Sequence, residues 1–281
     1  MGIYYNIMLN KNPNSNHKYQ QRGSQSASNG MKKSISIIIV TYNSARTVEK
    51  CLISIKAQQE VYAQTIVVDN ASSDATVDKV SKLNPDYLIK RKTNGGFAMA
   101  ANEGAKIATN HYLLFLNPDA ELKEKAIWEL VREMERDDQI ALVGGKFVSK
   151  DGQPMVSFGN FPSVKTEIIQ KLKLHKILPW SRYVAPSFLS KRLFQKTHPV
   201  DWVSGGFCLV RKSAFDEIKG FDENYFLYLE DIDLSKRIHN LGCQIIFCPK
   251  AVAVHHQRLS ASEEERKYEK ESLEYYRNKF K

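Results

Sequence analysis

Residues 36–43 read Ser-Ile-Ile-Ile-Val-Thr-Tyr-Asn, a run of β-branched side chains that stops abruptly at polar ones. β-Branched residues favour strands, and a strand that is apolar on both faces is typical of a buried parallel sheet. The polar residues Thr41, Tyr42 and Asn43 come where the strand ends, so we expect them at the carboxyl edge of the sheet. This short stretch therefore predicts both a fold class and the edge at which ligands bind in such folds.

The same pattern of apolar run, polar stop and amphipathic helix recurs along the N-terminal half of the chain. Strands are predicted at residues 36–40, 65–68, 87–89, 112–116 and 140–143. Helices are predicted between them, at residues 48–55, from 74, at 94–105 and at 122–135. Apolar strands that alternate with amphipathic helices indicate an α/β fold, with a mostly parallel sheet and helices on both faces.

The second half of the chain is less regular. Residues 151–200 contain five prolines among scattered basic and apolar residues, and we interpret them as an insert of loops or short helices. Order returns at residues 200–210, and a further helix is predicted to begin at Glu230. Two more strands are expected at 243–247 and 251–254, and a charged helix follows from Ser262.

Composition limits the classes to which the protein can belong. Its 281 residues are 42% hydrophobic and 26% charged, as in ordinary globular proteins, and no apolar run is long enough for a membrane helix. The net charge of +10 comes from residues 1–33, with five Lys or Arg and no acid, and from residues 161–200, with eight against one acid. Such local basicity argues against a protein that coats nucleic acid. The four cysteines lack metal-binding spacing and are interpreted as reduced structural thiols.

Carboxylates mark two places that could carry chemistry. Asp119 follows a buried strand and a proline, where it could bind a divalent cation or simply close a turn. Glu230, Asp231 and Asp233 open one helix, where they could stabilise its first turn or supply a general base. His255 ends an apolar strand and is either a metal ligand or a structural histidine.

The glycine motifs that the sequence lacks exclude three common kinds of site in α/β proteins. No dinucleotide-binding glycine motif follows the first strand, and the chain contains neither a P-loop nor the nucleophile elbow of an α/β-hydrolase. Gly205-Gly206 either lets a ligand approach the backbone closely or forms a bulge. Each of these features is ambiguous alone, but their order along one α/β chain is informative.

Five motifs in this order resemble those of family 2 glycosyltransferases, which have the Rossmann-like GT-A fold, and most closely the rhamnosyltransferase-like branch. The motifs are Ile37–Asn43, Val67–Asp74, Asn94–Ala98, Leu116–Asp119, and Gly205-Gly206 with Glu230–Leu234. The resemblance covers about residues 34–260 and implies a nucleotide-sugar half at 34–145. An acceptor and catalytic-base half at 146–260 would carry the basic insert at 151–200. Outside it lie a tail at 1–33, expected to be disordered, and a charged helix at 261–281.

The resemblance also implies a role for each candidate residue. Those expected to bind the nucleotide-sugar donor are Thr41, Tyr42, Asn43, Asp69, Asn70, Asn94, Gly95, Gly96 and Asn117, with Asp69 or Asn70 accepting a hydrogen bond from the pyrimidine N3–H. Asp119 would be the carboxylate of the family's DxD-type motif, with His255 as a second ligand, for Mg²⁺ or Mn²⁺. Asp231 would be the catalytic base. Those expected on the acceptor side are Trp202, Gly205, Gly206 and Glu230. Asn70 and Asn117 stand where many relatives carry acids, which leaves a single carboxylate for the metal.

By the same resemblance the chain is expected to be an inverting, metal-dependent glycosyltransferase of cell-surface polysaccharide synthesis. The expected donor is dTDP-rhamnose, and the expected acceptor is a glycan or a lipid-linked glycan. The alternatives are transfer from a UDP-hexose or UDP-N-acetylhexosamine, and a nucleotide-sugar-binding protein without activity. A cytoplasmic location without a nucleic-acid partner is expected. Residues 161–200 are expected either to dock peripherally on the inner face of the plasma membrane or to pack on the catalytic core.

Overall fold

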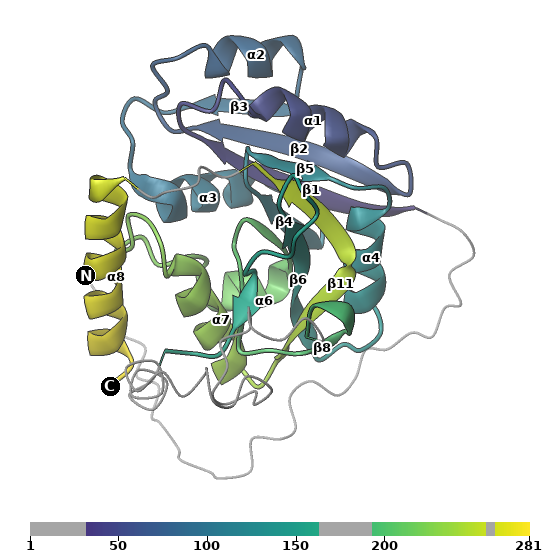
Figure 1. Ribbon diagram of the computed structural model, residues 1–281, viewed down its shortest axis with the longest axis vertical. Coiled ribbons are helices and arrows are strands. Elements are labelled where there is room, and N and C mark those ends of the chain that lie inside the picture. The colour runs from purple at the N-terminus through teal and green to yellow at the C-terminus, as the bar shows by residue number, and fades with distance from the viewer. Residues whose placement is uncertain (1–31, 163–192, 257–261) are drawn as a thin grey trace, which may run out of the picture. The chain divides into compact units, whose positions relative to one another are not determined.

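A nine-stranded β-sheet runs through the described part of the chain (Figure 1). The computed structural model describes residues 32–162, 193–256 and 262–281. The strands lie in the order β3-β2-β1-β4-β10-β6-β11-β5, and the short β8 pairs with β11. Their bounds are Lys33–Thr41 (β1), Val61–Asp69 (β2), Tyr87–Lys90 (β3), Tyr112–Leu116 (β4), Ala120–Leu122 (β5), Ile140–Val148 (β6), His198–Pro199 (β8), Phe207–Arg211 (β10) and Gln244–His255 (β11). A separate two-stranded sheet pairs Phe158–Gly159 (β7) with Trp202–Val203 (β9).

The N-terminal half of the sheet is parallel, as the β-branched strands predict. β1 pairs in parallel with β2 and β4, and β2 with β3, so the carboxyl ends of these four strands meet at one edge. β10 then enters between β4 and β6 and is antiparallel to both. Phe207, at the amino end of β10, therefore lies opposite Leu116, at the carboxyl end of β4. This reversal brings Gly205-Gly206 to the same edge as the polar ends of the parallel strands.

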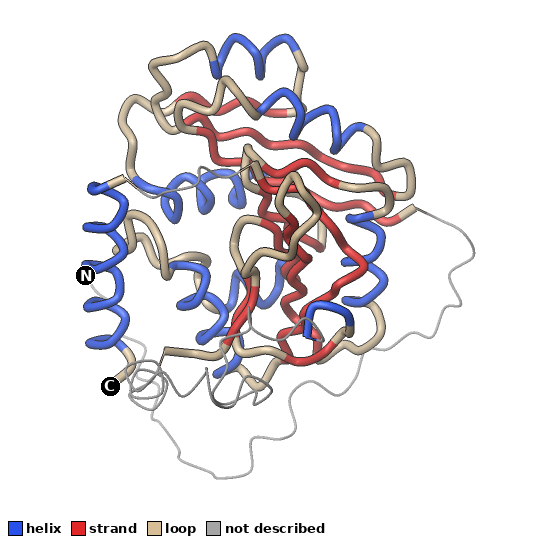
Figure 2. The backbone as a smooth tube through the Cα atoms, viewed as in Figure 1, coloured by secondary structure: helices blue, strands red, loops and turns tan. Residues whose placement is uncertain are grey.

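Helices cover both faces of the sheet (Figure 2). Successive side chains of a strand point to opposite faces, so Ile37 and Ile39 pack in one apolar cluster with α1 and α4, whereas Ile38 packs in the other with α3 and α7. Burial of each such side chain stabilises the fold by about 1.5–3 kcal/mol. The helices are Val48–Lys56 (α1), Thr76–Lys82 (α2), Gly96–Ile107 (α3), Ala126–Met134 (α4), Lys212–Glu217 (α6), Glu230–Asn240 (α7) and Glu263–Lys279 (α8).

Pairing with β11 explains two differences in length between predicted and observed elements of the N-terminal half. The helix predicted at 122–135 begins only at Ala126, because Ala120–Leu122 pairs with β11 as strand β5. The strand predicted at 140–143 continues to Val148, because β11 supplies a partner along that whole length. In both places a long-range strand pairing overrides the local pattern.

The two strands predicted at 243–247 and 251–254 are one continuous strand, β11. Its pairing with β6 shifts register between Cys248 and Val252. Such an irregularity adds unpaired residues to one strand without ending it, so the sequence pattern breaks while the strand goes on.

The charged helix predicted from Ser262 is α8. The Ser262 hydroxyl accepts a hydrogen bond from the backbone N–H of Glu265 at 3.1 Å, and the Glu265 carboxylate accepts one from the backbone N–H of Ser262 at 2.6 Å. This reciprocal capping box satisfies two otherwise unpaired N–H groups and defines where the helix begins.

Two predicted segments lie largely outside the described residues, namely the tail at 1–33 and the insert at 151–200. The residues from Lys32 onward form one compact unit. Within the three described ranges, no helix has the length and apolar character required to cross a membrane.

Candidate active site

Asp69, at the end of β2, lies beside Thr41 at the end of β1, because parallel pairing puts these two residues in register. The Asp69 carboxylate accepts hydrogen bonds from the Thr41 hydroxyl at 2.9 Å, from the Ser72 hydroxyl at 2.6 Å and from the Ser72 backbone N–H at 2.9 Å. Only 2% of Asp69 is exposed. Three donors on one buried carboxylate fix its orientation and leave one acceptor position, on Oδ2.

Asn70 uses its full hydrogen-bonding capacity within the protein. Its Oδ1 accepts from Arg91 Nη1 at 2.8 Å and from the Gly95 backbone N–H at 3.2 Å. Its Nδ2 donates to Asn94 Oδ1 at 2.7 Å and to the Gly96 backbone oxygen at 3.0 Å. Asn70 therefore ties β2 to the start of α3 and binds together the residues that the sequence analysis assigned to the donor.

Arg91 is part of this network, and the sequence analysis missed it. It directly follows β3, and its backbone N–H donates to the Asp69 carbonyl at 2.9 Å. Besides Asn70, its guanidinium contacts Glu103 on α3, with 3.2 Å between Nε and Oε2. A signal was available, because Arg91 is a polar residue that directly follows the third strand, as Asn70 directly follows the second.

Tyr42 and Asn43, both expected to bind the donor, are exposed where β1 ends. Tyr42 is 51% exposed. Asn43 adopts a left-handed backbone conformation, with φ of 48°, and its Oδ1 accepts from the Ser73 backbone N–H at 2.9 Å. This contact, together with one from the Asn43 backbone N–H to Ser72 Oγ at 2.9 Å, joins the loops after β1 and β2.

Asn117, Asp119 and His255 come together where β4 ends. His255 Nε2 lies 3.0 Å from Asp119 Oδ1 and 3.4 Å from Asn117 Nδ2. The antiparallel pairing of β11 with β5 places His255 opposite Ala120, which accounts for the contact. The His255 ring also stacks on Phe147, with 4.5 Å between ring centroids. The structure therefore unites the two metal-ligand candidates that are far apart in the sequence.

This group fits a divalent cation in its donor chemistry but is not a complete cage. A carboxylate and an imidazole suit Mn²⁺, and a carboxylate suits Mg²⁺. Among the described residues, no group of three or more His, Cys, Asp or Glu side chains is arranged to hold a metal. Asp119 and His255 would thus supply two ligands, and oxygens of a bound diphosphate would have to supply others.

Gly205-Gly206 lies between Asn117 and Asp231. The Gly205 backbone N–H donates to Asp231 Oδ2 at 3.0 Å, and the Gly206 carbonyl accepts from the Asn117 backbone N–H at 2.8 Å. A Cβ added at Gly206 would lie 2.5 Å from Asn117 Nδ2, and one at Gly205 would lie 3.1 Å from Asp231 Cβ. The pair is therefore a close backbone approach that joins the Asp119 edge to the acidic helix.

The three acids at the start of α7 have different environments. Asp233 is fully buried and paired with Arg237 and Lys279. Burial raises the pKa of Asp231, against the opposing effect of hydrogen bonds from the backbone N–H groups of Gly205 and Ile232. The helix start therefore combines a structural ion pair at Asp233 with a carboxyl at Asp231 that faces the Gly205 segment.

Of the three acids, Glu230 has the fewest interactions to offset the cost of burying its carboxyl group. It is 7% exposed, and its Oε2 is buried without a hydrogen-bond partner among the described residues. Burial, and then the charge of neighbouring Asp231, raises the pKa of Glu230 to about 8. Buried carboxyls with displaced pKa values are concentrated at functional sites.

The backbone before these acids is strained. Tyr228 and Leu229 both adopt left-handed conformations, with φ of 69° and 63°. Leu229 is also the N-cap residue of α7, where its side chain makes no capping hydrogen bond. Left-handed backbone at non-glycine residues costs about 1–3 kcal/mol each and is typical of functional segments.

Trp202 is positioned by the two-stranded sheet. Its Nε1 donates to the Asn160 carbonyl at 3.0 Å, and its ring packs on Gly159. These contacts give it no direct link to Asp231, so its expected role on the acceptor side stays a prediction.

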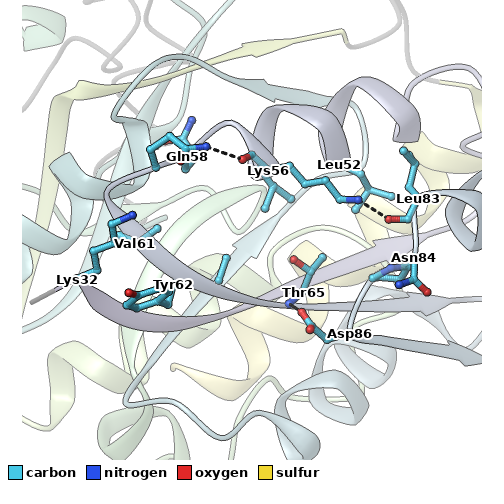
Figure 3. A pocket seen from close by; sticks show the side chains of 14 residues that line it. Lys32, Leu52, Lys56, Gln58, Val61, Tyr62, Thr65, Leu83, Asn84 and Asp86 are labelled. Carbon is cyan, nitrogen blue, oxygen red and sulfur yellow. Dashed lines mark hydrogen bonds between the residues drawn. The ribbon is translucent and has the colours of Figure 1, made fainter.

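A pocket of about 430 Å³ lies at the opposite end of β2 from Asp69 (Figure 3). It is lined by residues of α1, by the start of β2, and by the segment after α2, where Lys56 Nζ donates to the Leu83 carbonyl at 2.6 Å. None of the candidate residues lines it. We place the site at the carboxyl edge of the sheet, because the polar strand ends and the buried carboxylates converge there.

Two family models match overlapping parts of the chain. A family model described as "Glycosyl transferase family 2" matches residues 36–219, which include every candidate residue before the acidic helix. A second model, described as "N-terminal domain of galactosyltransferase", matches residues 188–259, which include Asp231 and His255.

Individual relatives and a solved structure resemble most of the chain. It is 27% identical over 240 residues to the N-acetylglucosaminyl-diphospho-decaprenol L-rhamnosyltransferase of Mycobacterium tuberculosis, across 79% of this chain and 75% of that protein. It is 28% identical over 232 residues to rhamnosyltransferase WbbL of Escherichia coli, across 78% and 82% of the two. The mannosyltransferase PcManGT of Pyrobaculum calidifontis, solved with GDP-Man and Mn²⁺, superposes with a TM-score of 0.58 at 18% identity, across 82% of this chain and 59% of that one. The fold is thus the GT-A fold.

Proposed function

This chain belongs to glycosyl transferase family 2, and on that premise we propose that it transfers rhamnose from dTDP-rhamnose to a glycan or lipid-linked glycan. The two rhamnosyltransferases named above support the choice of sugar. The name of the mycobacterial relative specifies a lipid-linked acceptor, which supports an acceptor of that class here. We propose that the product has the anomeric configuration inverted relative to the donor.

The donor base would bind at the ends of β1 and β2. Asp69 is the better candidate for accepting the pyrimidine N3–H, because Asn70 already makes four hydrogen bonds within the protein. Asp69 keeps one acceptor position on Oδ2. Asn70 would act by holding Arg91, Asn94 and the start of α3 in place around the nucleotide.

The diphosphate of the donor would lie beside Asp119. Asp119 and His255 would hold a divalent cation, Mg²⁺ or Mn²⁺, which when bound neutralises the negative charge that develops on the departing diphosphate. Asn117 would lie beside this pair, since its amide nitrogen is 3.4 Å from His255 Nε2.

Asp231 would remove the proton of the acceptor. The acceptor hydroxyl oxygen forms the new bond to the anomeric carbon, the bond from that carbon to the diphosphate breaks with its electron pair, and the hydroxyl proton passes to the Asp231 carboxylate. A carboxylate whose pKa burial raises is a stronger base at neutral pH than an exposed one. A single displacement of this kind inverts the configuration.

One observation carries the proposal, namely the backbone contact that Gly205-Gly206 makes with both Asn117 and Asp231. It joins the residues suited to a diphosphate to the residue suited to a proton, as a displacement between donor and acceptor requires. We further propose that transfer takes place on the cytoplasmic side of the membrane, where a lipid-linked acceptor would present its sugar.

The test is a transfer assay with the purified protein, Mn²⁺ and a lipid-linked N-acetylglucosamine diphosphate as acceptor. We expect dTDP-rhamnose to be used and UDP-galactose, UDP-N-acetylglucosamine and GDP-mannose to be used poorly. Faster transfer from a UDP sugar would replace the donor assignment with the alternative that the galactosyltransferase match favours. Donor binding without transfer to any acceptor tested would favour a protein without activity.

A further inference from the structure

α8 packs along the segment that leads into the acidic helix (Figure 1). The Ser272 hydroxyl donates to the Leu227 carbonyl at 2.9 Å, and Ser272 is only 6% exposed. One turn earlier on α8, Tyr268 lies over Phe226, with 4.5 Å between ring centroids. One face of an otherwise charged helix is thus committed to residues 226 and 227.

A second set of contacts joins the last turn of α8 to the same region. Lys279 Nζ lies 2.5 Å from Asp222 Oδ2 and 2.5 Å from Asp233 Oδ2. Tyr275 donates its hydroxyl to Asp222 at 3.0 Å. Burial alone would raise the pKa of Asp222, but hydrogen bonds from Lys279 and Asn224 and the Lys279 charge hold it at about 2. Lys279 is therefore an ion-pair partner shared by α7 and the loop before it.

The two sets of contacts enclose the strained residues. Tyr228 and Leu229, with φ of 69° and 63°, lie between Leu227, which Ser272 holds, and Asp233, which Lys279 holds. Strained backbone persists only where the surrounding structure over-determines it. Asp231 lies two residues after Leu229, in the first turn of α7, so its position depends on the strain being maintained.

We propose that Ser272 and Lys279 of α8 are positioning residues that hold Asp231 in place against Gly205. The inference rests on the proposed function of Asp231 as the base. It adds to that function a helix that lies beyond the motifs and His255 in the sequence. Neither Ser272 nor Lys279 contacts Asp119 or Asp69 in the described structure, so donor binding should not depend on them.

The test compares Lys279→Met and Ser272→Ala with Lys270→Met, which changes an exposed lysine of the same helix. We expect kcat to fall about 10- to 100-fold in Lys279→Met and less in Ser272→Ala, because small misplacements of a catalytic group cost up to ~10²-fold. The KM for the donor should stay within twofold, and Lys279→Arg should recover most of kcat. Amide hydrogen exchange at residues 226–232 should be faster in the first two variants and unchanged in Lys270→Met.

Wild-type kcat and wild-type exchange at 226–232 in Lys279→Met would overturn the inference. Ser272→Ala keeps the question decidable if Lys279→Met fails to fold, because it removes one hydrogen bond and no charge. Asp231→Asn distinguishes a failure of the proposed base from a failure of the proposed positioning role. If Asp231→Asn is inactive while both α8 variants behave as wild type, only the positioning role is wrong. If Asp231→Asn is active, the proposed base is wrong and with it the positioning role.

Discussion

Asp69-Asn70 and Glu230-Asp231 are two pairs of polar residues at the same edge of the fold, and all but the partly exposed Asp231 are buried, but the two pairs are stabilised differently. Every hydrogen-bonding atom of Asn70 has a partner, and Asp69 accepts three hydrogen bonds. Glu230 has a buried oxygen without a partner in the described structure, and burial raises the pKa of both acids. The comparison indicates that the proposed donor side is already held by internal hydrogen bonds, whereas the proposed proton-accepting side keeps an unfavourable arrangement of the kind found at functional sites.

The largest effect should come from Asp231→Asn. The amide is nearly the same size but accepts no proton, so kcat should fall by about 10²–10⁴. The assay is initial rate at saturating donor and acceptor, with Asp216→Asn, an exposed carboxyl on α6, as the matched control. If kcat falls less than fivefold, Asp231 is not the base, and the two pairs of residues do not differ in function as proposed.

The next effect concerns the residues that would hold the metal. We expect Asp119→Ala to reduce metal-dependent turnover about 10²-fold, and His255→Ala about tenfold with partial recovery at higher Mn²⁺. His256→Ala is the control, because His256 directly follows β11 and makes a similar contact to a carboxylate, with 3.0 Å between its Nε2 and Glu121 Oε2. A chelator that leaves the wild-type rate unchanged would contradict metal dependence altogether.

A smaller effect should follow from Arg91→Ala on the donor side. This change leaves Asn70 Oδ1 short of one donor and Glu103 without its ion-pair partner. Loss of a hydrogen bond from a charged group costs about 1.5–3 kcal/mol, so Tm and donor affinity should both fall while the pH dependence of turnover stays the same. Thermal unfolding and donor titration check this, with the exposed neighbour Lys92→Ala as control. An unchanged donor affinity would show that the network around Asn70 does not shape the nucleotide site.

The smallest effect should be the pH dependence of stability that Glu230 causes. The unfolded side chain ionises near pH 4.5, whereas the folded one holds its proton up to about pH 8. Wild-type stability should therefore fall as pH rises through that interval, and Glu230→Gln should remove this loss. We expect the Tm of the variant, relative to wild type, to be higher at pH 8 than at pH 5, by about 2–4 °C for each kcal/mol of stability that ionisation of Glu230 removes. A Tm difference that is constant with pH would mean that Glu230 is not held neutral.

Local pattern predicted the parallel half of the fold well, because each buried strand there is also a continuous β-branched or apolar run. Local pattern did not predict that Asp119 and His255 lie together, because the antiparallel pairing of β11 with β5 brings them into contact. Only the family resemblance predicted them as a pair of metal ligands. The insertion of β10, the continuity of β11 and the late start of α4 all depend on strand pairing between distant segments.

The acidic cluster shows the limit most clearly. Glu230, Asp231 and Asp233 look alike in sequence. In the structure Asp233 forms ion pairs with Arg237 and Lys279, whereas Asp231 accepts a hydrogen bond from the Gly205 backbone N–H. No local sequence signal distinguishes the role of one acid from that of another, because their partners are distant in sequence. Lys279 belongs to α8, and Gly205 belongs to the loop before β10. Arg91 is different, since its place after β3 matched the rule that identified the other strand ends.

The central claim is that donor binding and proton removal belong to separate regions of the site. Calorimetric titration of dTDP, with Mn²⁺, onto wild type, Asp231→Asn and Asp119→Ala tests it most directly. We predict that Asp231→Asn binds with a Kd within twofold of wild type, whereas Asp119→Ala binds at least tenfold more weakly. A loss of affinity in Asp231→Asn as large as that in Asp119→Ala would contradict the claim.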